Sequence, residues 1–240
     1  MSRFKKKKLL FVIPNFSSFI LKDLSLLKKH FDLRIEHFSG LKKAPISLPR
    51  LLIGVIWSDL TFSRFADIHA FFAVLISKIY KRKSIVVVGG YEVAKVTEID
   101  YGLMLSPFFS RVVKYILERA DQVLTVDESL KRDAIINANV TGQNIMTVPN
   151  GYNSEIWRFK GKKDDTVITV ANIKHENIKR KGLETFVEAA KFLPEVKFII
   201  IGRHIDQSAN DLKLLAPPNV EFPGHIPHQQ LVTWYSRAKV

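Results

Sequence analysis

Residues 145–202 decide the fold, and they read IMTVPNGYNSEIWRFKGKKDDTVITVANIKHENIKRKGLETFVEAAKFLPEVKFIIIG. Short apolar runs bounded by Pro, Gly or charged residues predict strands, and apolar residues three and four apart predict a helix. In chain order the stretch predicts a strand at 145–148, a hinge at Pro149, Asn150 and Gly151, a strand at 166–170, a basic loop at 174–181, a helix opening at Gly182 and a strand at 197–201. One α/β unit therefore ends at the hinge, and a second one begins after it.

Strand and helix patterns alternate on both sides of the hinge, which is typical of doubly wound parallel sheets. The other predicted strands are 9–13, 33–38, 85–88, 122–126 and 220–222, and 51–57 is a third apolar run. Helices are predicted around 20–31, 65–79, 109–120, 128–137, 183–193, 209–215 and 228–235, and 40–49 is predicted to be a loop. We expect an α/β protein of two Rossmann-like domains, 1–158 and 159–240. The second is expected to be incomplete, because residues 238–240 look like the start of another strand.

Composition limits the chemistry. The 240 residues include no cysteine, which excludes disulfides and thiolate chemistry and suits a reducing, cytoplasmic setting. The formal net charge of +14 favours phosphate-bearing partners: nucleic acid, anionic lipid headgroups or nucleotide-sugars. No nucleic-acid-binding signature is present, so nucleic acid is not an expected partner. Five cations in residues 3–8 indicate either a solvated start or a peripheral contact with the inner face of a membrane.

A cationic cluster is the first candidate site. Lys179, Arg180, Lys181 and Gly182 precede a predicted helix, whose free backbone N–H groups carry partial positive charge. Such a cluster can hold a diphosphate by charge and by direct hydrogen bonds. A solvated basic loop is the alternative.

The loops after two predicted strands form the second candidate site, because open α/β sheets bind ligands at the carboxyl ends of their strands. Asn15, Phe16 and Ser17 follow the first strand, and Gly89, Gly90, Tyr91 and Glu92 follow the strand at 85–88. Neither loop is a GxGxxG or GxxxxGK[ST] phosphate loop, which disfavours a nicotinamide-dependent oxidoreductase. Ordinary turns remain the alternative for both loops.

Few side chains suggest catalysis. Glu92 and Asp100 are the nearest carboxylates that could act as a base or bind sugar hydroxyls. His69, between Ile68 and Ala70, is more often a core or capping histidine than a catalyst. The histidines have no metal-ligand spacing, and we expect no metal site.

Four motifs carry a family resemblance. They are VPNGYN at 148–153, RKGLETFVEAA at 180–190, FIIIG at 198–202, and NVEFPGH at 219–225 with Leu231, Tyr235 and 238–240. In order and spacing they resemble the retaining nucleotide-sugar glycosyltransferases of the GT-B fold, the large group four. Residues 9–14 and 85–92 agree more loosely with the same family.

The resemblance implies two Rossmann-like domains facing across a cleft, with the acceptor on the N-terminal domain and the nucleotide-sugar donor on the C-terminal one. It implies a UDP-, GDP- or ADP-sugar donor, a sugar or lipid-linked acceptor, retention of anomeric configuration, no cofactor and no obligatory metal. Lys181 matches the family's phosphate-binding lysine, and Gly202 matches a glycine near the nucleotide. The donor-side candidates are Lys181, Arg180, Asn172, Gly202 and Arg203. The acceptor-side candidates are Asn15, Phe16, Ser17, Gly89, Gly90, Tyr91 and Glu92.

The chain departs from the family pattern at three places. Asn172 stands where the family usually has an arginine, and Gly89 stands where it often has a histidine. The carboxylate pair Glu-x7-Glu would lie beyond Val240, so we expect this chain to be a fragment of a longer enzyme. The rival hypothesis is a noncatalytic, glycosyltransferase-like binding module.

Overall fold

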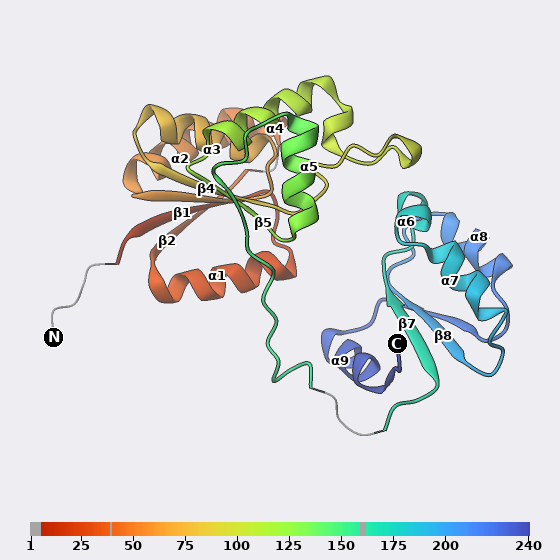
Figure 1. The fold of residues 1–240 in the computed structure, drawn as a ribbon. Coiled ribbons are helices and arrows are strands. Elements are labelled where there is room, and N and C mark those ends of the chain that lie inside the picture. Colours follow the sequence, from red (N-terminus) through yellow and green to blue (C-terminus); the bar gives the residue numbers. More distant parts are fainter. Residues whose placement is uncertain (1–5, 39, 159–161) are drawn as a thin grey trace. The chain divides into compact units, whose positions relative to one another are not determined.

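The computed structural model describes residues 6–38, 40–158 and 162–240, and the chain forms two compact units, residues 1–150 (unit 1) and 151–240 (unit 2). Both units are α/β and both sheets are parallel, as the sequence predicts (Figure 1). The boundary falls within the Pro-Asn-Gly segment at 149–151. Within the described residues, no helix is both long and apolar enough to cross a membrane.

Unit 1 contains a six-stranded sheet in the order β2-β1-β3-β4-β5-β6. Its strands are β1 (Lys8–Ile13), β2 (Asp32–His37), β3 (Leu60–Arg64), β4 (Lys83–Val88), β5 (Gln122–Thr125) and β6 (Ile145–Thr147). Its helices are α1 (Ser18–His30), α2 (Ala44–Trp57), α3 (Ile68–Ile79), α4 (Pro107–Arg119) and α5 (Glu128–Ala138), with 3₁₀ turns at Leu41–Lys43, Thr97–Ile99 and Leu103–Leu105.

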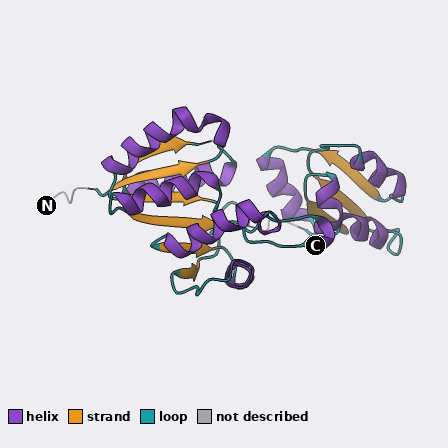
Figure 2. Ribbon diagram, turned by 90° about the horizontal axis from the view of Figure 1, so that it is seen from above, coloured by secondary structure: helices purple, strands orange, loops and turns teal. Residues whose placement is uncertain are grey.

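The unbroken apolar run of β1 is explained by helices on both faces of the sheet. Leu10 and Val12 belong to the core that the sheet shares with α2, α3 and α4. Phe11 and its same-face neighbours pack instead against Ile20 and Leu24 of α1. Figure 1 shows α1 on one side of the sheet and α2, α3 and α4 on the other, and Figure 2, seen from above, shows helices lying over the strands of unit 1. A strand covered on both faces needs apolar residues at every position.

The predicted loop at 40–49 is wrong, because α2 begins at Ala44 and also includes the apolar run at 51–57. Leu51 and Val55, four residues apart, face the core, as a helix requires. The neighbouring strand β3 was missed because its sequence, LTFSR, is partly polar. Its buried Thr61 is nevertheless satisfied, since its hydroxyl lies 3.1 Å from that of Ser77.

Unit 2 contains a three-stranded sheet in the order β7-β8-β9. Its strands are β7 (Thr166–Val170), β8 (Lys197–Ile201) and β9 (Val220–Gly224), and its helices are α6 (His175–Arg180), α7 (Leu183–Ala190), α8 (Ser208–Leu215) and α9 (His228–Arg237). Leu183 and Val187 of α7 pack on Phe198 and Ile200 of β8. Residues 174–181 were predicted to be a loop, and this prediction is wrong, because α6 includes most of them.

The last residues of the chain run beside β7. The backbone N–H of Lys239 donates to the carbonyl of Thr166, and the carbonyl of Val240 accepts from Ile168, both at 2.9 Å. A parallel bridge joins Asp164 to Ala238. The sequence prediction that residues 238–240 begin a strand agrees with this pairing.

Candidate functional site

A cavity of about 340 Å³ lies at the carboxyl edge of the unit 1 sheet. The chain leaves β1 for β2 on one side and returns to β3 on the other, so the loops after β1 and β3 diverge at a topological switch point. Loops after β1, β3 and β4 line the cavity, together with the first turn of α3 and the segment around the 3₁₀ turn at 103–105. The lining residues are Pro14, Asn15, Phe65, Asp67, His69, Gly89, Tyr91, Glu92, Tyr101 and Leu103.

Glu92 holds the loops around the cavity together. Its carboxylate accepts backbone N–H groups from Ala66 at 3.1 Å, Gly89 at 3.0 Å and Gly90 at 2.9 Å. The side chain is buried, and burial raises the pKa of Glu92, although the backbone N–H groups act in the opposite direction. This geometry suits a residue that positions the cavity wall better than an exposed general base.

The Phe65 ring occupies the space that a side chain at Gly89 would fill. A Cβ atom at Gly89 would lie 2.6 Å from the Phe65 ring, which is far too close. Phe65 itself has a positive φ of 72°, an uncommon conformation for a bulky residue that often marks functional loops. The absence of a side chain at residue 89 therefore lets an aromatic ring line the cavity.

His69 brings an imidazole to the cavity from the first turn of α3. Its Nε2 lies 2.7 Å from the carbonyl oxygen of Arg64, so Nε2 carries the proton and donates it. Burial lowers the pKa of His69, while its hydrogen bond to Arg64 and the charge of Asp67 act in the opposite direction. The sequence classed His69 as a core or capping histidine, and the structure shows it both buried and lining the cavity.

The structure separates the predicted acceptor-side residues into two groups. Asn15, Gly89, Tyr91 and Glu92 line the cavity, but Phe16, Ser17 and Gly90 are not among its lining residues. Phe16 is exposed and its ring lies 5.3 Å from that of His37. Asp100 is exposed in a left-handed conformation outside the cavity. Phe65, Asp67, Tyr101 and Leu103 were missed, and assigning β3 would have revealed the first two.

A chain of hydrogen bonds organises the predicted donor side of unit 2. Arg180 donates through Nε and Nη2 to Oδ1 of Asn177, at 3.2 and 2.7 Å. Asn177 is buried and donates to the carbonyl of Asn172 at 2.8 Å. The side chain of Asn172 in turn accepts the backbone N–H of Arg203 at 3.1 Å. These contacts join the loop after β7, the helix α6 and the loop after β8.

Gly202, at the end of β8, allows two loops to approach closely. A Cβ atom at residue 202 would lie 2.0 Å from the carbonyl oxygen of Ala171. The loops after β7 and β8 can therefore touch only because residue 202 is glycine.

Positive charge gathers where α6 meets α7. Arg180 ends α6, Lys181 follows it, and Gly182 precedes α7 in a left-handed conformation with φ 62°. The first hydrogen bond of α7 runs from Phe186 to Gly182, so the N–H groups of residues 183–185 have no partner within the helix. Cations beside the positive end of a helix repel it, and a bound anion would relieve that repulsion. Among the described residues, no cluster of His, Asp and Glu side chains could hold a metal ion.

Comparisons with known proteins identify the fold. HepE of Anabaena, solved with UDP and glucose, superposes with a TM-score of 0.68 at 13% identity, over 96% of this chain and 72% of that one. Sucrose-phosphate synthase of Thermosynechococcus elongatus gives a TM-score of 0.68 at 13% identity, over 97% of this chain and 74% of that one. The chain has the GT-B fold. UDP-GlcNAc 2-epimerase of Neisseria meningitidis, bound to UDP-GlcNAc, follows with a TM-score of 0.55 at 13% identity, over 96% and 76% of the two chains.

No protein-family model matches the sequence. A curated relative is a phosphatidylinositol N-acetylglucosaminyltransferase component of Arabidopsis thaliana, 21% identical over 151 residues. The match covers 59% of this chain and 34% of the relative, so the chain spans about a third of that protein's length.

Proposed function

We propose that this chain belongs to a nucleotide-sugar glycosyltransferase that transfers a sugar with retention of anomeric configuration. The donor is a UDP-, GDP- or ADP-sugar, bound by unit 2, and the acceptor is a sugar or a lipid-linked molecule, bound by unit 1. The reaction uses neither a cofactor nor a metal. Peripheral attachment to an anionic membrane belongs to the same proposal.

The meeting point of α6 and α7 carries this proposal. Arg180 and Lys181 adjoin three backbone N–H groups that have no partner within α7. A nucleoside diphosphate offers several anionic oxygens, which suit both the cations and the N–H groups. As the bond between the sugar and the diphosphate breaks, negative charge grows on the leaving oxygen, and the same groups stabilise it. HepE, which shares the fold, was solved with UDP and glucose.

The cavity of unit 1 supports an acceptor site. Its volume of about 340 Å³ suits one sugar ring with part of its aglycone. Tyr91 and Tyr101, with ring centroids 5.0 Å apart, offer apolar surfaces against which a sugar can stack. Asn15, Asp67 and His69 offer polar groups for its hydroxyls. In this arrangement Glu92 positions the wall, and His69 supplies the imidazole that the resemblance leads one to expect at residue 89.

Nucleotide binding to the complete protein tests the donor site. Calorimetric titration with UDP, GDP and ADP should show that one of them binds. Lys181→Ala should weaken that binding by about 1–3 kcal/mol, the cost of a lost hydrogen bond to a charged group. Lys191→Ala, which removes an exposed lysine just after the opposite end of α7, should leave it unchanged. Equal affinities for the two variants, or no binding of any nucleotide, would remove the donor site from the proposal.

Product analysis by NMR separates the possible activities. The nucleotide-sugar that binds is incubated with the chain and a panel of sugar and lipid-linked acceptors, with and without EDTA. A glycoside with the donor's anomeric configuration, formed equally in EDTA, agrees with the proposal. An inverted product contradicts retention, and loss of activity in EDTA contradicts metal independence. A C2 epimer formed without acceptor indicates an epimerase, and binding without any product in the complete protein favours the noncatalytic module.

A further inference from the structure

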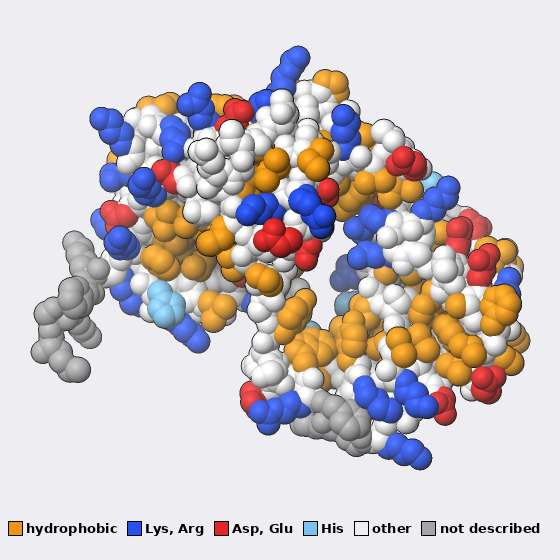
Figure 3. All heavy atoms as spheres, in the orientation of Figure 1, with side chains coloured by type: hydrophobic (Ala, Val, Ile, Leu, Met, Phe, Trp, Pro, Cys, Tyr) orange, Lys and Arg blue, Asp and Glu red, His pale blue; other side chains and the backbone are white. Residues whose placement is uncertain are grey.

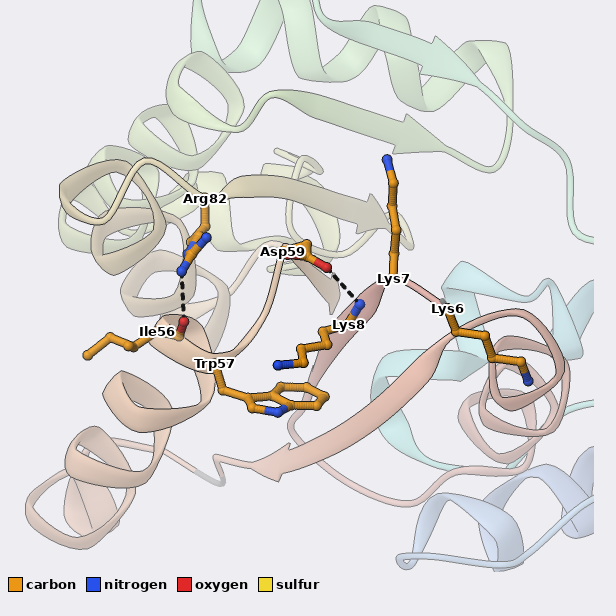
Figure 4. Close-up of a pocket in the computed structure, with 7 residues that line it drawn as sticks. All are labelled: Lys6, Lys7, Lys8, Ile56, Trp57, Asp59 and Arg82. Atoms are coloured by element: carbon orange, nitrogen blue, oxygen red, sulfur yellow. Dashed lines mark hydrogen bonds between the residues drawn. The ribbon is translucent and has the colours of Figure 1, made fainter. Parts of the chain in front are cut away.

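A second cavity, of about 410 Å³, lies at the opposite edge of the unit 1 sheet, where the strands begin. Lys6, Lys7 and Lys8 at the start of β1 line it, together with Trp57 at the end of α2 and Arg82 before β4. Figure 4 shows the Lys8 side chain extending over the Trp57 ring and Arg82 directed toward the end of α2. This basic pocket is separate from the candidate site at the carboxyl edge.

The cations of the basic pocket have little compensating negative charge. Within the part of the chain that the structure describes, no carboxylate lies within 4 Å of the charged groups of Lys6, Lys7, Lys8 or Arg82. The carboxylate of Asp59, which also lines the pocket, accepts the backbone N–H of Lys8 at 2.9 Å. The Arg34 guanidinium and the Lys8 ammonium lie 4.0 and 5.5 Å from the centre of the Trp57 ring. Lys8 and Arg34 therefore bring positive charge to the Trp57 ring, whereas the Lys6 and Lys7 side chains point away from it (Figure 4). The ammonium of Lys6 donates to the carbonyl of Lys28 in α1 at 3.3 Å.

Beside the pocket, α2 presents an apolar stripe to solvent. Ile46, Ile53 and Ile56 are 64%, 62% and 43% exposed. Their spacing of seven and three residues places them on one side of the helix, while Leu51 and Val55 occupy the side that faces the core. A helix that is apolar on both sides has an outer surface that gains free energy from being covered.

Charge indicates what covers this stripe. Lys42, Lys43 and Arg50 are exposed along α2 and its preceding turn, and Lys81 is exposed before Arg82. Figure 3 shows Lys and Arg side chains beside hydrophobic ones at the left of unit 1. Aliphatic side chains bordered by cations, with a tryptophan at their boundary, match an anionic bilayer, in which acyl chains lie beneath phosphate headgroups.

We propose that the outer face of α2 and the adjoining basic pocket dock onto the surface of an anionic lipid bilayer. Ile46, Ile53 and Ile56 enter the headgroup boundary, and Lys6, Lys7, Lys8 and Arg82 bind lipid phosphates. Trp57 lies at the level of the headgroups. This docking rests on the membrane attachment included in the proposed function and names the surface that makes it. It does not involve the donor chemistry proposed for unit 2, and it leaves the carboxyl edge of the sheet uncovered.

Vesicle flotation tests the docking with the 240-residue chain. Vesicles of phosphatidylcholine alone are compared with vesicles that also contain phosphatidylglycerol. The chain should float with the anionic vesicles and remain free of the neutral ones. The double variant Lys6→Glu, Lys7→Glu should lower the partition coefficient by about tenfold or more, because each cation near the surface contributes to attraction. Ile46→Ser with Ile53→Ser should lower it while leaving net charge unchanged.

The control variant has the same net charge as the Lys6→Glu, Lys7→Glu variant, but its two substitutions lie outside the proposed docking surface. Lys22→Glu with Lys95→Glu replaces two exposed lysines, on α1 and in the loop after β4. This pair should bind anionic vesicles far more tightly than the Lys6, Lys7 pair. Equal losses would show that only overall charge matters and would overturn the docking surface. Circular dichroism checks that each variant folds.

Tryptophan fluorescence tests the docking without any substitution in α2. In a chain with Trp157→Phe and Trp234→Phe, Trp57 is the remaining tryptophan. Vesicles of brominated phosphatidylglycerol should quench its fluorescence, because bromine quenches only at close range. Absence of quenching in floated protein would overturn the proposal. So would saturable binding of inorganic phosphate or pyrophosphate that blocks flotation at millimolar concentration, since the pocket would then be a site for a soluble anion.

Discussion

The carboxylate of Glu92 accepts the backbone N–H of Ala66, 26 residues earlier in the chain, at 3.1 Å. This contact joins the loop after β3 to the loop after β4 across the cavity of unit 1. Two further N–H groups, from Gly89 and Gly90, share the same carboxylate. The shape of the cavity therefore depends on one buried side chain.

Replacing Glu92 should loosen both loops. Glu92→Ala leaves three N–H groups without their acceptor, that of the buried Ala66 among them, and we expect a loss of roughly 1–3 kcal/mol in the free energy of unfolding. The amide protons of Ala66, Gly89 and Gly90 should lose protection in hydrogen exchange. The matched variant Glu98→Ala, at an exposed residue of the same segment, should change neither quantity. Unchanged protection in Glu92→Ala would show that the carboxylate does not hold the loops.

His69 should make unit 1 sensitive to mild acid. Its pKa is lowered in the folded state, so its stabilising contribution is present above the ordinary histidine pKa and is lost as pH falls. The gap in unfolding free energy between the wild type and His69→Gln should therefore shrink from about pH 7.5 to about pH 5. Urea titrations across this range measure it, with His30→Gln on the exposed end of α1 as the baseline. A gap that widens in acid would contradict a neutral buried imidazole.

Asp121 gives a separate prediction at lower pH. Burial alone would raise its pKa, but hydrogen bonds from Lys78, Lys83 and Ser84 outweigh burial and lower it to about 2. Its contribution is therefore present above about pH 4 and is lost as pH falls toward about 2. Asp121→Asn should cost about 1 kcal/mol at neutral pH and almost nothing near pH 2. Chemical denaturation at several pH values should show the stabilities of wild type and Asp121→Asn becoming equal as pH falls. Asp32→Asn, at an exposed residue, is the control.

Gly202 should tolerate no side chain. Gly202→Ala forces the loops after β7 and β8 apart, because the new methyl group would lie 2.0 Å from a backbone oxygen. We expect unit 2 to lose ~1–3 kcal/mol of stability and the Asn172–Arg203 hydrogen bond to weaken. Gly151→Ala, where nothing lies within 4 Å, should stay within about 0.5 kcal/mol of the wild type. Similar melting curves for the two variants would contradict the close approach at residue 202.

Much of the fold could be predicted from the sequence because its strands are apolar on both faces. β1 and β8 are unbroken apolar runs, as expected for strands of a parallel sheet that is covered on both faces. The predicted positions of both strands are confirmed. The region from residue 40 to residue 64 could not be predicted in this way. An apolar run such as 51–57 fits a helix as well as a strand, and the outer isoleucines of α2 hide its periodicity. β3 escaped notice because Thr61 and Ser63 are buried in it.

The candidate site was predicted in part for the same reason. Asn15, Gly89, Tyr91 and Glu92 follow strands that were recognised, and all four line the cavity. Asp67 and His69 follow β3, and without that strand no sequence argument could bring them to the same edge. The role of Glu92 could not be predicted from the sequence pattern either. Its carboxylate accepts hydrogen bonds from backbone N–H groups, and every residue except proline has such a group.

Arg64 contacts both the cavity wall and the last residue of unit 1. Its carbonyl oxygen accepts from His69 in the cavity wall, and its guanidinium donates to Asn150, the last residue of unit 1, at 3.1 Å. Through its backbone and its side chain, Arg64 therefore joins the cavity wall to the segment where the chain leaves unit 1, and this connection does not pass through the sheet.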